Sequence, residues 1–325
     1  MLKTITILVP AYNEAEVLDI FLAEMQKVTS EIPTYKFDYL FINDGSTDKT
    51  LTILERLAEE NDTVGFLSLS RNFGKEAAMT AGLDHIVSDA VVIFDADLQD
   101  PPELLHDFVR EWEAGYDVVY AQREIRDGES WVKKATASLF YKLMKRISRT
   151  PVPPDTGDCR LMTRRAVASL NRLSENNRFM KGLFAWVGYP SKAVLYNRAP
   201  RVAGNTKFNY WKLWNFALDG ITSFTHAPLK LATYIGFFIS VFSFFFGAWI
   251  ILKTFIFGEA VAGYPTIMVT ILFLGGMQMF FIGVLGEYLG RIFTETKRRP
   301  VYLLDEARLP GDVSVRKVDS SSALK

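Results

Sequence analysis

Two long uncharged apolar stretches near the C-terminal end constrain the fold of this chain more than any other feature. No charged residue lies between Lys230 and Lys253, and none lies between Glu259 and Glu287. As helices, both stretches are long enough to cross the roughly 30 Å hydrocarbon core of a bilayer. Their phenylalanine-rich sequences leave no polar face, which argues against the alternative of a helical hairpin buried in a soluble core. We therefore predict a two-helix transmembrane hairpin over residues 229–292.

Charged residues around the hairpin predict its orientation. Lys297, Arg298 and Arg299 follow the second stretch closely, whereas residues 257–264 between the stretches contain no Lys or Arg. By the positive-inside rule, both large ends of the chain then lie in the cytoplasm. The apolar stretch at the N-terminus is too short for an export signal. We expect a multi-pass protein of the plasma membrane (the inner membrane of a bacterium), with a basic cytoplasmic tail over residues 293–325.

The first 120 residues alternate between strand-like and helix-like segments. The predicted strands are TITILVPAY, DYLFIND, VGFLSLS, AVVIFDAD and DVVYAQR, and the predicted helices between them cover about residues 14–31, 49–61, 77–86 and 102–113. This alternation is typical of βαβ units and predicts an α/β domain with a mainly parallel sheet. Neither G-x-G-x-x-G nor G-x-x-x-x-G-K-[ST] occurs, which excludes a dinucleotide fingerprint and a P-loop.

Polar residues gather directly after the predicted strands. They are Tyr12, Asn13 and Glu14 after the first strand, Asn43, Asp44 and Gly45 after the second, Arg71, Gly74 and Lys75 after the third, and Asp95 and Asp97 after the fourth. Because the carboxyl ends of parallel strands meet at one edge of a sheet, these residues predict a ligand crevice. We expect Asp44 to recognise the base or ribose of the ligand. For Ser46, we favour a structural role as a turn and helix N-cap residue.

The segment Asp95-Ala96-Asp97, followed by Gln99, predicts a metal site in that crevice. Two carboxylates one residue apart, with a possible amide ligand, suit a hard divalent cation such as Mg²⁺ or Mn²⁺ that also binds substrate phosphates. The natural ligand is a nucleotide diphosphate. The alternative is that the two acids only solvate a loop or cap the following helix.

Two further segments predict helices in the plane of the membrane interface. The first covers about residues 131–149, where a row of apolar residues is surrounded by Lys and Arg, a pattern typical of helices that lie among lipid headgroups. Packing of its apolar side on the sheet is the alternative. The second covers about residues 209–226 and contains Trp211 and Trp214 shortly before the break at Pro228.

Charge and cysteine content narrow the function classes. The chain has 37 basic and 37 acidic residues, so its overall charge gives no reason to expect nucleic acid as a partner. Cys159 is the single cysteine, which excludes an internal disulfide and fits a reducing compartment.

The chain resembles the family 2 polyprenyl-phosphate glycosyltransferases of GT-A fold, because several of their motifs occur in it in the same order. This group includes dolichol-phosphate mannose synthase and bactoprenol glucosyltransferase. The motifs are VPAYNE (9–14), NDGSTD (43–48), SRNFGKEAAMTAGL (70–83), DADLQDPPE (95–103), GDCRLMTRR (157–165) and RVAGNTKF (201–208), and the likeness extends to about residue 300. Cys159 stands where an aromatic residue is frequent in the family, and Asn205-Thr206 where an acid-Ser pair is frequent. The resemblance implies a Rossmann-like GT-A domain over residues 1–228, including both interfacial helices, followed by the transmembrane hairpin.

The resemblance also implies roles for individual residues. Nucleotide contacts would come from Pro10, Tyr12, Glu14, Asp44, Lys75 and Asp95, and the metal would be held by Asp97 and Gln99 with Asp95. Asp158 would be the catalytic carboxylate, with Arg201 binding phosphate in the RVAGNTKF segment. Arg123, Lys134 and Ser138 would hold the phosphate of the lipid acceptor.

The implied reaction is transfer of a hexose, most simply from UDP-glucose, to undecaprenyl or another polyprenyl phosphate. A single catalytic carboxylate implies inversion, by analogy with glycoside hydrolysis. The lipid-linked sugar would serve surface polysaccharide or glycan modification. The partners would be the bilayer, a second copy or a tetramer of the chain, a separate flippase and a second glycosyltransferase. Three alternatives remain: a GDP-mannose-dependent synthase of the dolichol type, a catalytically silent membrane scaffold, and a processive synthase, for which the Q-x-x-R-W motif is missing.

Overall fold

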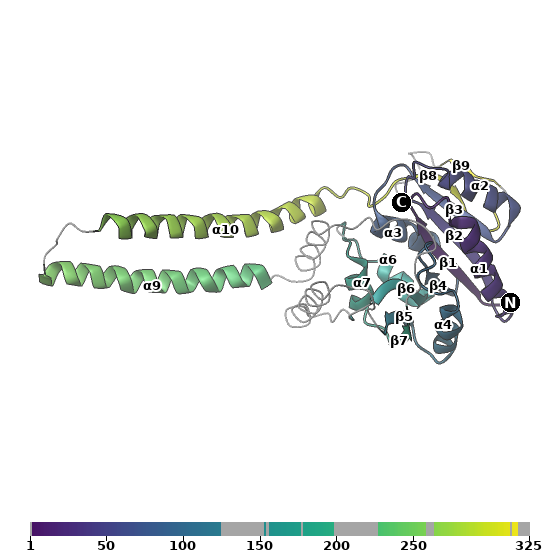
Figure 1. Cartoon of the computed structure of the whole chain (residues 1–325), viewed down its shortest axis with the longest axis horizontal. Helices are drawn as coiled ribbons and strands as arrows, with labels where there is room; N and C mark the ends of the chain where they lie inside the picture. Colours follow the sequence, from purple (N-terminus) through teal and green to yellow (C-terminus); the bar gives the residue numbers. More distant parts are fainter. Residues whose placement is uncertain are drawn as a thin grey trace.

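The computed structural model describes residues 2–124, 153, 156–176, 178–197, 227–257, 263–312 and 314–317. Figure 1 shows one α/β domain from which a long helical hairpin projects. The predicted interfacial helices lie outside the described residues, as do Lys134, Ser138 and Arg201.

A nine-stranded mixed sheet forms the centre of the domain, with strand order β7-β5-β6-β4-β1-β2-β3-β8-β9. The strands are β1 (Thr4–Ala11), β2 (Lys36–Asn43), β3 (Val64–Leu69), β4 (Ala90–Ile93), β5 (Val118–Arg123), β6 (Thr156–Thr163), β7 (Ser191–Tyr196), β8 (Leu304–Arg308) and β9 (Arg316–Lys317). The central strands β4, β1, β2 and β3 are parallel, as predicted, whereas β6 runs antiparallel between β4 and β5. The α/β class is confirmed, and all five predicted strands are present.

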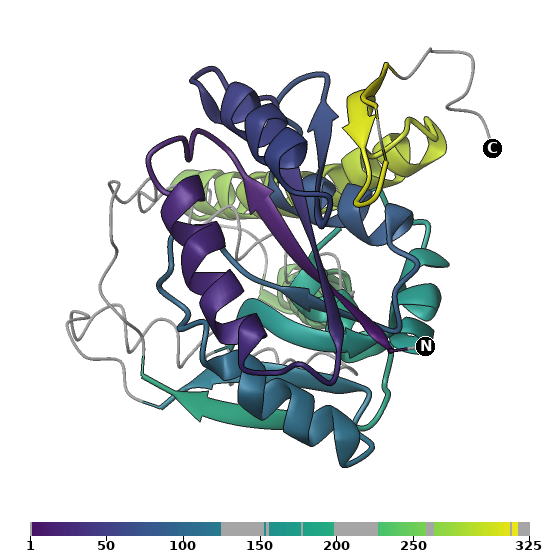
Figure 2. The same ribbon diagram turned by 90° about the vertical axis from the view of Figure 1, so that its right-hand side faces the viewer.

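Helices cover both faces of this sheet. They are α1 (Leu18–Ser30), α2 (Thr50–Glu60), α3 (Lys75–His85), α4 (Leu104–Glu113), α6 (Arg164–Asn171) and α7 (Met180–Trp186). Residues of β1 and β2 alternate between two hydrophobic cores: Ile7 and Phe41 pack with α1, α2 and α4, while Leu8 and Ile42 pack with α3, α6 and α7. Figure 2 shows helices on both faces of the sheet, and burial on both faces explains why these strands are continuous apolar runs.

The predicted start of the first helix was wrong by four residues. We expected it at Glu14, but α1 begins at Leu18. The backbone N–H of Glu14 instead donates to Thr50 Oγ1 at 3.0 Å, and that of Ala15 donates to Asp48 Oδ2 at 3.3 Å. These bonds tie the segment after β1 to the start of α2, so it does not continue the helix.

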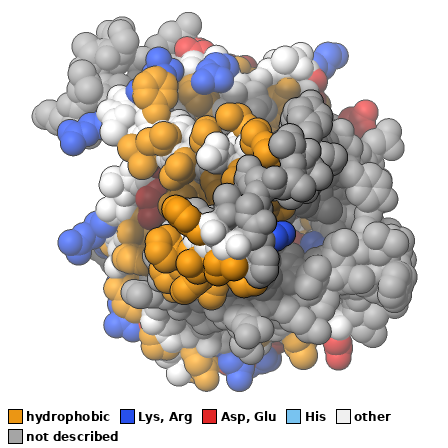
Figure 3. Space-filling view, turned by 90° about the vertical axis from the view of Figure 1, so that its left-hand side faces the viewer, with side chains coloured by type: hydrophobic (Ala, Val, Ile, Leu, Met, Phe, Trp, Pro, Cys, Tyr) orange, Lys and Arg blue, Asp and Glu red, His pale blue; other side chains and the backbone are white. Residues whose placement is uncertain are grey.

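The C-terminal part forms the hairpin and then returns to the domain. Helices α9 (Ala227–Phe257) and α10 (Tyr264–Thr296) run away from the sheet and back (Figure 1). Among the described residues, the stretch Phe273–Thr296 is long and apolar enough to cross a membrane, and a shorter apolar helix covers Ala232–Phe246. Viewed toward the tip of the hairpin, hydrophobic side chains dominate its surface (Figure 3).

After α10, the chain adds a strand to the edge of the sheet. Strand β8 pairs antiparallel with β3, and β9 pairs with β8. The Tyr302 hydroxyl donates to Asp84 Oδ2 at 3.0 Å, and Ser70 N donates to the carbonyl oxygen of Leu303 at 2.9 Å. Part of the segment that we predicted as a basic tail is therefore integral to the sheet.

Candidate active site

The residues predicted to form the crevice meet at one edge of the sheet. The parallel strands β1, β2, β3 and β4 all end there, and β6 begins there because it runs in the opposite direction. In the antiparallel register, Ile93 lies opposite Arg160. Continuing this register by two residues sets Asp95 opposite Asp158, although the two are far apart in the sequence.

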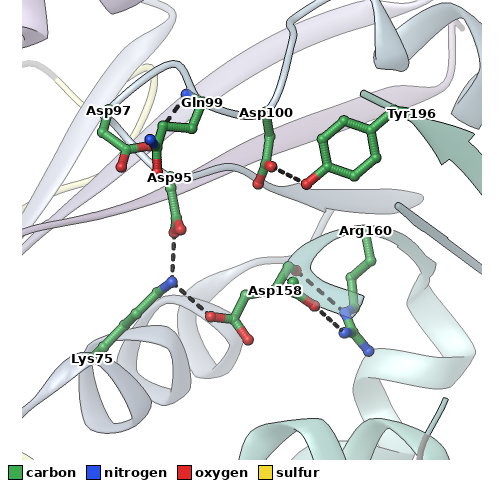
Figure 4. Close-up of polar contacts among 9 residues, drawn as sticks. Lys75, Asp95, Asp97, Gln99, Asp100, Asp158, Arg160 and Tyr196 are labelled. Atoms are coloured by element: carbon green, nitrogen blue, oxygen red, sulfur yellow. Dashed lines mark hydrogen bonds and ion pairs between the residues drawn. The ribbon is translucent and has the colours of Figure 1, made fainter. Parts of the chain in front are cut away.

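Lys75 joins these two carboxylates. Its Nζ lies 2.6 Å from Asp95 Oδ1 and 2.6 Å from Asp158 Oδ2 (Figure 4). Lys75 is the first residue of α3, so the start of this helix sets the position of the amine. The side chain of Asp158 is only 13% exposed, whereas that of Lys75 is 41% exposed. The cluster therefore opens toward solvent on the lysine side.

Charge pairing keeps this cluster ionised. Burial disfavours the charged form of Asp158, but the nearby Lys75 and Lys181 outweigh burial and hold the pKa of Asp158 well below its usual range. Burial would likewise lower the pKa of Lys75, but the charges of Asp158 and Asp95 raise it instead. Asp158 is thus a carboxylate at neutral pH and a weak base.

Arg160 fixes the backbone that carries Asp158. Its Nη2 donates to the Gly157 carbonyl at 2.8 Å, and its Nε donates to the Asp158 carbonyl at 3.2 Å. The guanidinium lies 3.7 Å from the ring centroid of Phe184 in α7. Burial lowers the pKa of Arg160 to about 10, which still leaves it charged. This role was missed in the sequence, where Arg160 is one of several arginines in its motif.

The predicted metal ligands form a second group beside the cluster (Figure 4). Gln99 N donates to Asp97 Oδ1 at 3.2 Å. The side-chain oxygen Oε1 of Gln99 is buried and accepts no hydrogen bond from the residues that the structure describes. An unpaired buried amide oxygen close to carboxylates fits an ion that prefers oxygen ligands. In the described part of the chain, no group of three or more His, Cys, Asp or Glu side chains is arranged to hold a metal. The residues present fit an ion of the Mg²⁺ kind, which uses one or two carboxylates and completes its shell with phosphate and water.

Asp44 organises the loop after β3. Its two carboxylate oxygens accept hydrogen bonds from Phe73 N at 2.7 Å and Gly74 N at 2.9 Å, and the residue is buried. Burial raises the pKa of Asp44. The neighbouring Gly45 has a φ of +60°, and a Cβ there would lie 2.2 Å from the carbonyl carbon of Arg71, so only glycine permits this approach. The assignment of Asp44 to a base or ribose stays a prediction.

The loops after β1 and β2 brace each other. Asn13, which has a φ of 54°, donates its N–H to Ser46 Oγ at 3.0 Å and accepts from Thr47 N at 2.8 Å through its side chain. Ser46 therefore supports the neighbouring loop, and α2 begins only at Thr50. The predicted nucleotide contacts Pro10, Tyr12 and Glu14 lie half-buried at this edge.

Of the predicted acceptor residues, Arg123 lies within the described part of the chain. It ends β5, and its Nε donates to the Tyr196 hydroxyl at 3.4 Å. The same hydroxyl donates to Asp100, which is buried. Neither Asp100 nor Tyr196 was singled out in the sequence. The acceptor roles of Arg123, Lys134, Ser138 and Arg201 stay predictions.

Comparison with known proteins gives consistent matches over almost the whole chain. A family model described as "Glycosyl transferase family 2" matches residues 6–170, and one described as "GtrB C-terminal hairpin" matches residues 227–292. An uncharacterized glycosyltransferase of Synechocystis sp. is 50% identical over 302 residues, which are 93% of this chain and 95% of that protein. A prophage bactoprenol glucosyl transferase homolog of Escherichia coli is 48% identical over 94% of this chain and 99% of its own length. The bactoprenol glucosyl transferase of Shigella phage SfX is 49% identical over 92% of this chain and 98% of its own length.

Solved structures match this chain at lower identity. Mannosyl-3-phosphoglycerate synthase from Rubrobacter xylanophilus is 17% identical, with a TM-score of 0.49, over 72% of this chain and 75% of that one. Glucosyl-3-phosphoglycerate synthase from Mycobacterium tuberculosis, solved with Mn²⁺, UDP-glucose and phosphoglyceric acid, is 19% identical with a TM-score of 0.45. That match covers 66% of this chain and 76% of the mycobacterial chain.

Proposed function

Because the chain belongs to glycosyltransferase family 2, we propose that it transfers glucose from UDP-glucose to bactoprenol phosphate, a polyprenyl phosphate. The observation that carries this proposal is the ionised Asp158, held by Lys75 opposite Asp95 in a domain that continues into the hairpin. The names of relatives at 48–49% identity supply the sugar and the lipid.

Two anionic groups meet in this reaction, and the chain supplies cations for both. Lys75 would offset charge on the diphosphate that leaves the sugar. Arg123, Lys134 and Arg201 would bind the acceptor phosphate through charge-assisted hydrogen bonds, which are about twice as strong as neutral ones. A Mg²⁺ or Mn²⁺ ion bound by Asp97 and Gln99, with Asp95, would add Lewis-acid stabilisation of the diphosphate.

The bond changes follow from a single catalytic carboxylate. An oxygen of the acceptor phosphate attacks C1 of glucose, while the bond from C1 to the diphosphate breaks and UDP leaves with the electron pair. Direct displacement of this kind inverts the configuration at C1. A phosphate monoester has its second pKa near 6, so the acceptor is already largely a dianion at pH 7. Asp158 therefore orients the reacting groups and does not need to remove a proton.

The hairpin would determine where the reaction takes place. We propose that both α9 and α10 cross the bilayer and that the α/β domain lies on the cytoplasmic side, where the basic residues after α10 would keep it. The segments around residues 131–149 and 209–226 would lie at the headgroups. Two spans offer no obvious transport path, so a separate flippase and a second glycosyltransferase would use the product. Assembly of the chain into dimers or tetramers belongs to the same proposal.

A donor panel tests this function. Full-length protein in vesicles that contain undecaprenyl phosphate is incubated with radiolabelled UDP-glucose, GDP-mannose or a UDP-pentose, and label is measured in extracted lipid. We expect lipid label from UDP-glucose that depends on the lipid phosphate. Label from GDP-mannose instead would favour the dolichol-type alternative. No lipid label from any donor, without hydrolysis of any sugar nucleotide, would indicate a silent scaffold.

A further inference from the structure

Lys181, a residue that the sequence did not single out, lies close enough to Asp158 for its charge to lower the pKa of that carboxylate. It lies in the first turn of α7, three residues before Phe184. Residues three apart share a face of a helix, and Phe184 packs against Arg160 next to Asp158. The face of α7 that carries Lys181 is therefore the face turned toward Asp158 and Arg160.

A hydrogen bond to α3 holds α7 in this position. Met180 N, adjacent to Lys181, donates to Glu76 Oε2 at 3.2 Å. Glu76 follows Lys75 directly in the first turn of α3. The two lysines thus occupy neighbouring helices that are joined by a hydrogen bond next to both of them.

Lys181 differs from the other cations of the cluster in its contacts with the described residues. Lys75 pairs with two carboxylates, and Arg160 is bonded to two carbonyl groups. The half-buried Lys181 forms no hydrogen bond or ion pair with the residues that the structure describes. Burial, together with the nearby charges of Lys75 and Arg160, lowers the pKa of Lys181, while the charge of Asp158 opposes this effect.

The charges of the cluster leave room for an anion. Lys75, Arg160 and Lys181 are the cations, and Asp95 and Asp158 are the anions. Burial and the charge of Asp158 raise the pKa of Glu76 to about 8, so this carboxyl group is mostly neutral at pH 7. Lys75, Arg160 and Lys181 then carry the positive charge nearest to Asp158, and of these three Lys181 is the one that forms no hydrogen bond or ion pair with the described residues.

The segment that carries Lys181 also lies next to the hairpin. Asn176 N, a few residues before α7, donates to both carboxylate oxygens of Glu295 at 3.0 and 3.1 Å. Glu295 lies in the last turn of α10. In Figure 1, α7 is on the side of the domain from which the hairpin projects, whereas α3 lies farther from it. The segment that leads into Lys181 is therefore bonded directly to the last turn of α10.

We infer that Lys181 binds the phosphate of the lipid acceptor and holds it beside Asp158. This inference rests on the proposed function, since it assigns one of the two anions of that reaction to one side of the carboxylate. The diphosphate of the donor then lies on the side of Lys75, and the two phosphate groups approach the sugar from opposite directions, as inversion requires.

The test compares Lys181→Met and Lys181→Arg with the wild-type enzyme in detergent micelles that contain undecaprenyl phosphate. Loss of one charge-assisted hydrogen bond predicts that Lys181→Met raises KM for the lipid acceptor by about 10- to 100-fold. We expect Lys181→Arg to recover most of this loss, and the Kd of UDP-glucose, measured by calorimetry, to stay within about twofold in both variants. Lys192→Met is the control, because it makes the same chemical change at an exposed position on β7. There, Lys192 Nζ lies 5.7 Å from the centroid of the Tyr116 ring.

An unchanged acceptor KM in Lys181→Met contradicts the inference, and so does a Kd for UDP-glucose that rises as much as the acceptor KM. If the Met variant unfolds, Lys181→Gln, which keeps a polar side chain but removes the charge, gives the same comparison. A wild-type enzyme that transfers no glucose to lipid contradicts the proposed function itself. If the wild-type enzyme transfers glucose normally and Lys181→Met or Lys181→Gln leaves KM for the lipid acceptor unchanged, only the role of Lys181 is contradicted.

Discussion

The ammonium group of Lys75 lies 2.6 Å from Asp158 Oδ2, so the proposed catalytic carboxylate is paired with a cation. A carboxylate whose pKa is held below its usual range stays ionised throughout the neutral range, and it is a poor acceptor of protons. The pairing therefore favours orientation over proton removal as the role of Asp158, and it predicts how the enzyme responds to pH.

The first prediction concerns Asp158→Asn. Folding lowers the pKa of Asp158. The ionised side chain therefore stabilises the folded protein above pH 4, which is about the pKa of an aspartate in the unfolded chain, and this stabilisation is lost only as the pH falls below that value. Between pH 5 and 9 the charge of Asp158 does not change, and the rate should follow the acceptor's second pKa near 6. We expect wild type and variant to have the same pH profile for kcat/KM, with the variant slower by about 10²-fold or more. A variant that recovers the wild-type rate at pH 8 to 9 would show that Asp158 acts as a base.

The second prediction concerns the bridge itself. Lys75→Met removes the cation between Asp95 and Asp158, so two carboxylates would face the incoming diphosphate without compensation. We expect the affinity for UDP-glucose to fall by about tenfold and transfer by more, because charged hydrogen bonds contribute about 1.5–3 kcal/mol each. Lys75→Arg, which keeps the charge, should lose less. Lys27→Met, an exposed change in the last turn of α1, serves as the control. Equal donor affinity in wild type and Lys75→Met would argue against a role of Lys75 toward the donor.

The third prediction concerns the metal. Asp97→Asn is nearly isosteric but removes one of the two carboxylate charges, so we expect loss of Mn²⁺ binding, measured by electron paramagnetic resonance, together with loss of transfer. Excess chelator should likewise stop the wild-type enzyme, and added Mg²⁺ should restore it. Asp62→Asn makes the same chemical change at an exposed position away from the site and should leave both properties intact. Near-normal turnover in Asp97→Asn would contradict the metal assignment.

The fourth prediction concerns the C-terminal strand. A chain that stops after Arg299 loses β8, its pairing with β3 and the bond from Ser70 N to Leu303. Since each hydrogen bond contributes about 1 kcal/mol, loss of the strand should lower the Tm of the domain by about 10 °C. Donor affinity should fall as well, because Ser70 immediately precedes the loop that Asp44 holds. A chain that stops after Lys317, and so keeps both strands, is the matched control. An unchanged Tm after the longer deletion would show that β8 is dispensable.

Sequence patterns predicted the first half of the fold because its strands are buried on both faces and read as continuous apolar runs. They did not predict β8, whose sequence LDEAR contains three charged residues. A strand at an edge needs no buried pattern, and charged side chains are common there. The antiparallel placement of β6 was not visible in the sequence either.

The same limits apply to the site. Asp95, Asp97 and Lys75 were predicted to share one edge because they follow parallel strands. Asp158 came only from the family resemblance, because its place depends on the direction of β6. Arg160 and Lys181 resemble ordinary surface cations in sequence, and their roles emerge only from the packing of α7 against β6.

The central claim is most directly tested by the product itself. Purified full-length enzyme, reconstituted with undecaprenyl phosphate and supplied with UDP-α-glucose, should form undecaprenyl phosphate that carries one glucose, with the β configuration at C1 by nuclear magnetic resonance. Absence of any glucosyl lipid in the presence of a divalent cation, or a lipid-linked glucose with the α configuration, would contradict the proposed direct displacement at C1 of glucose.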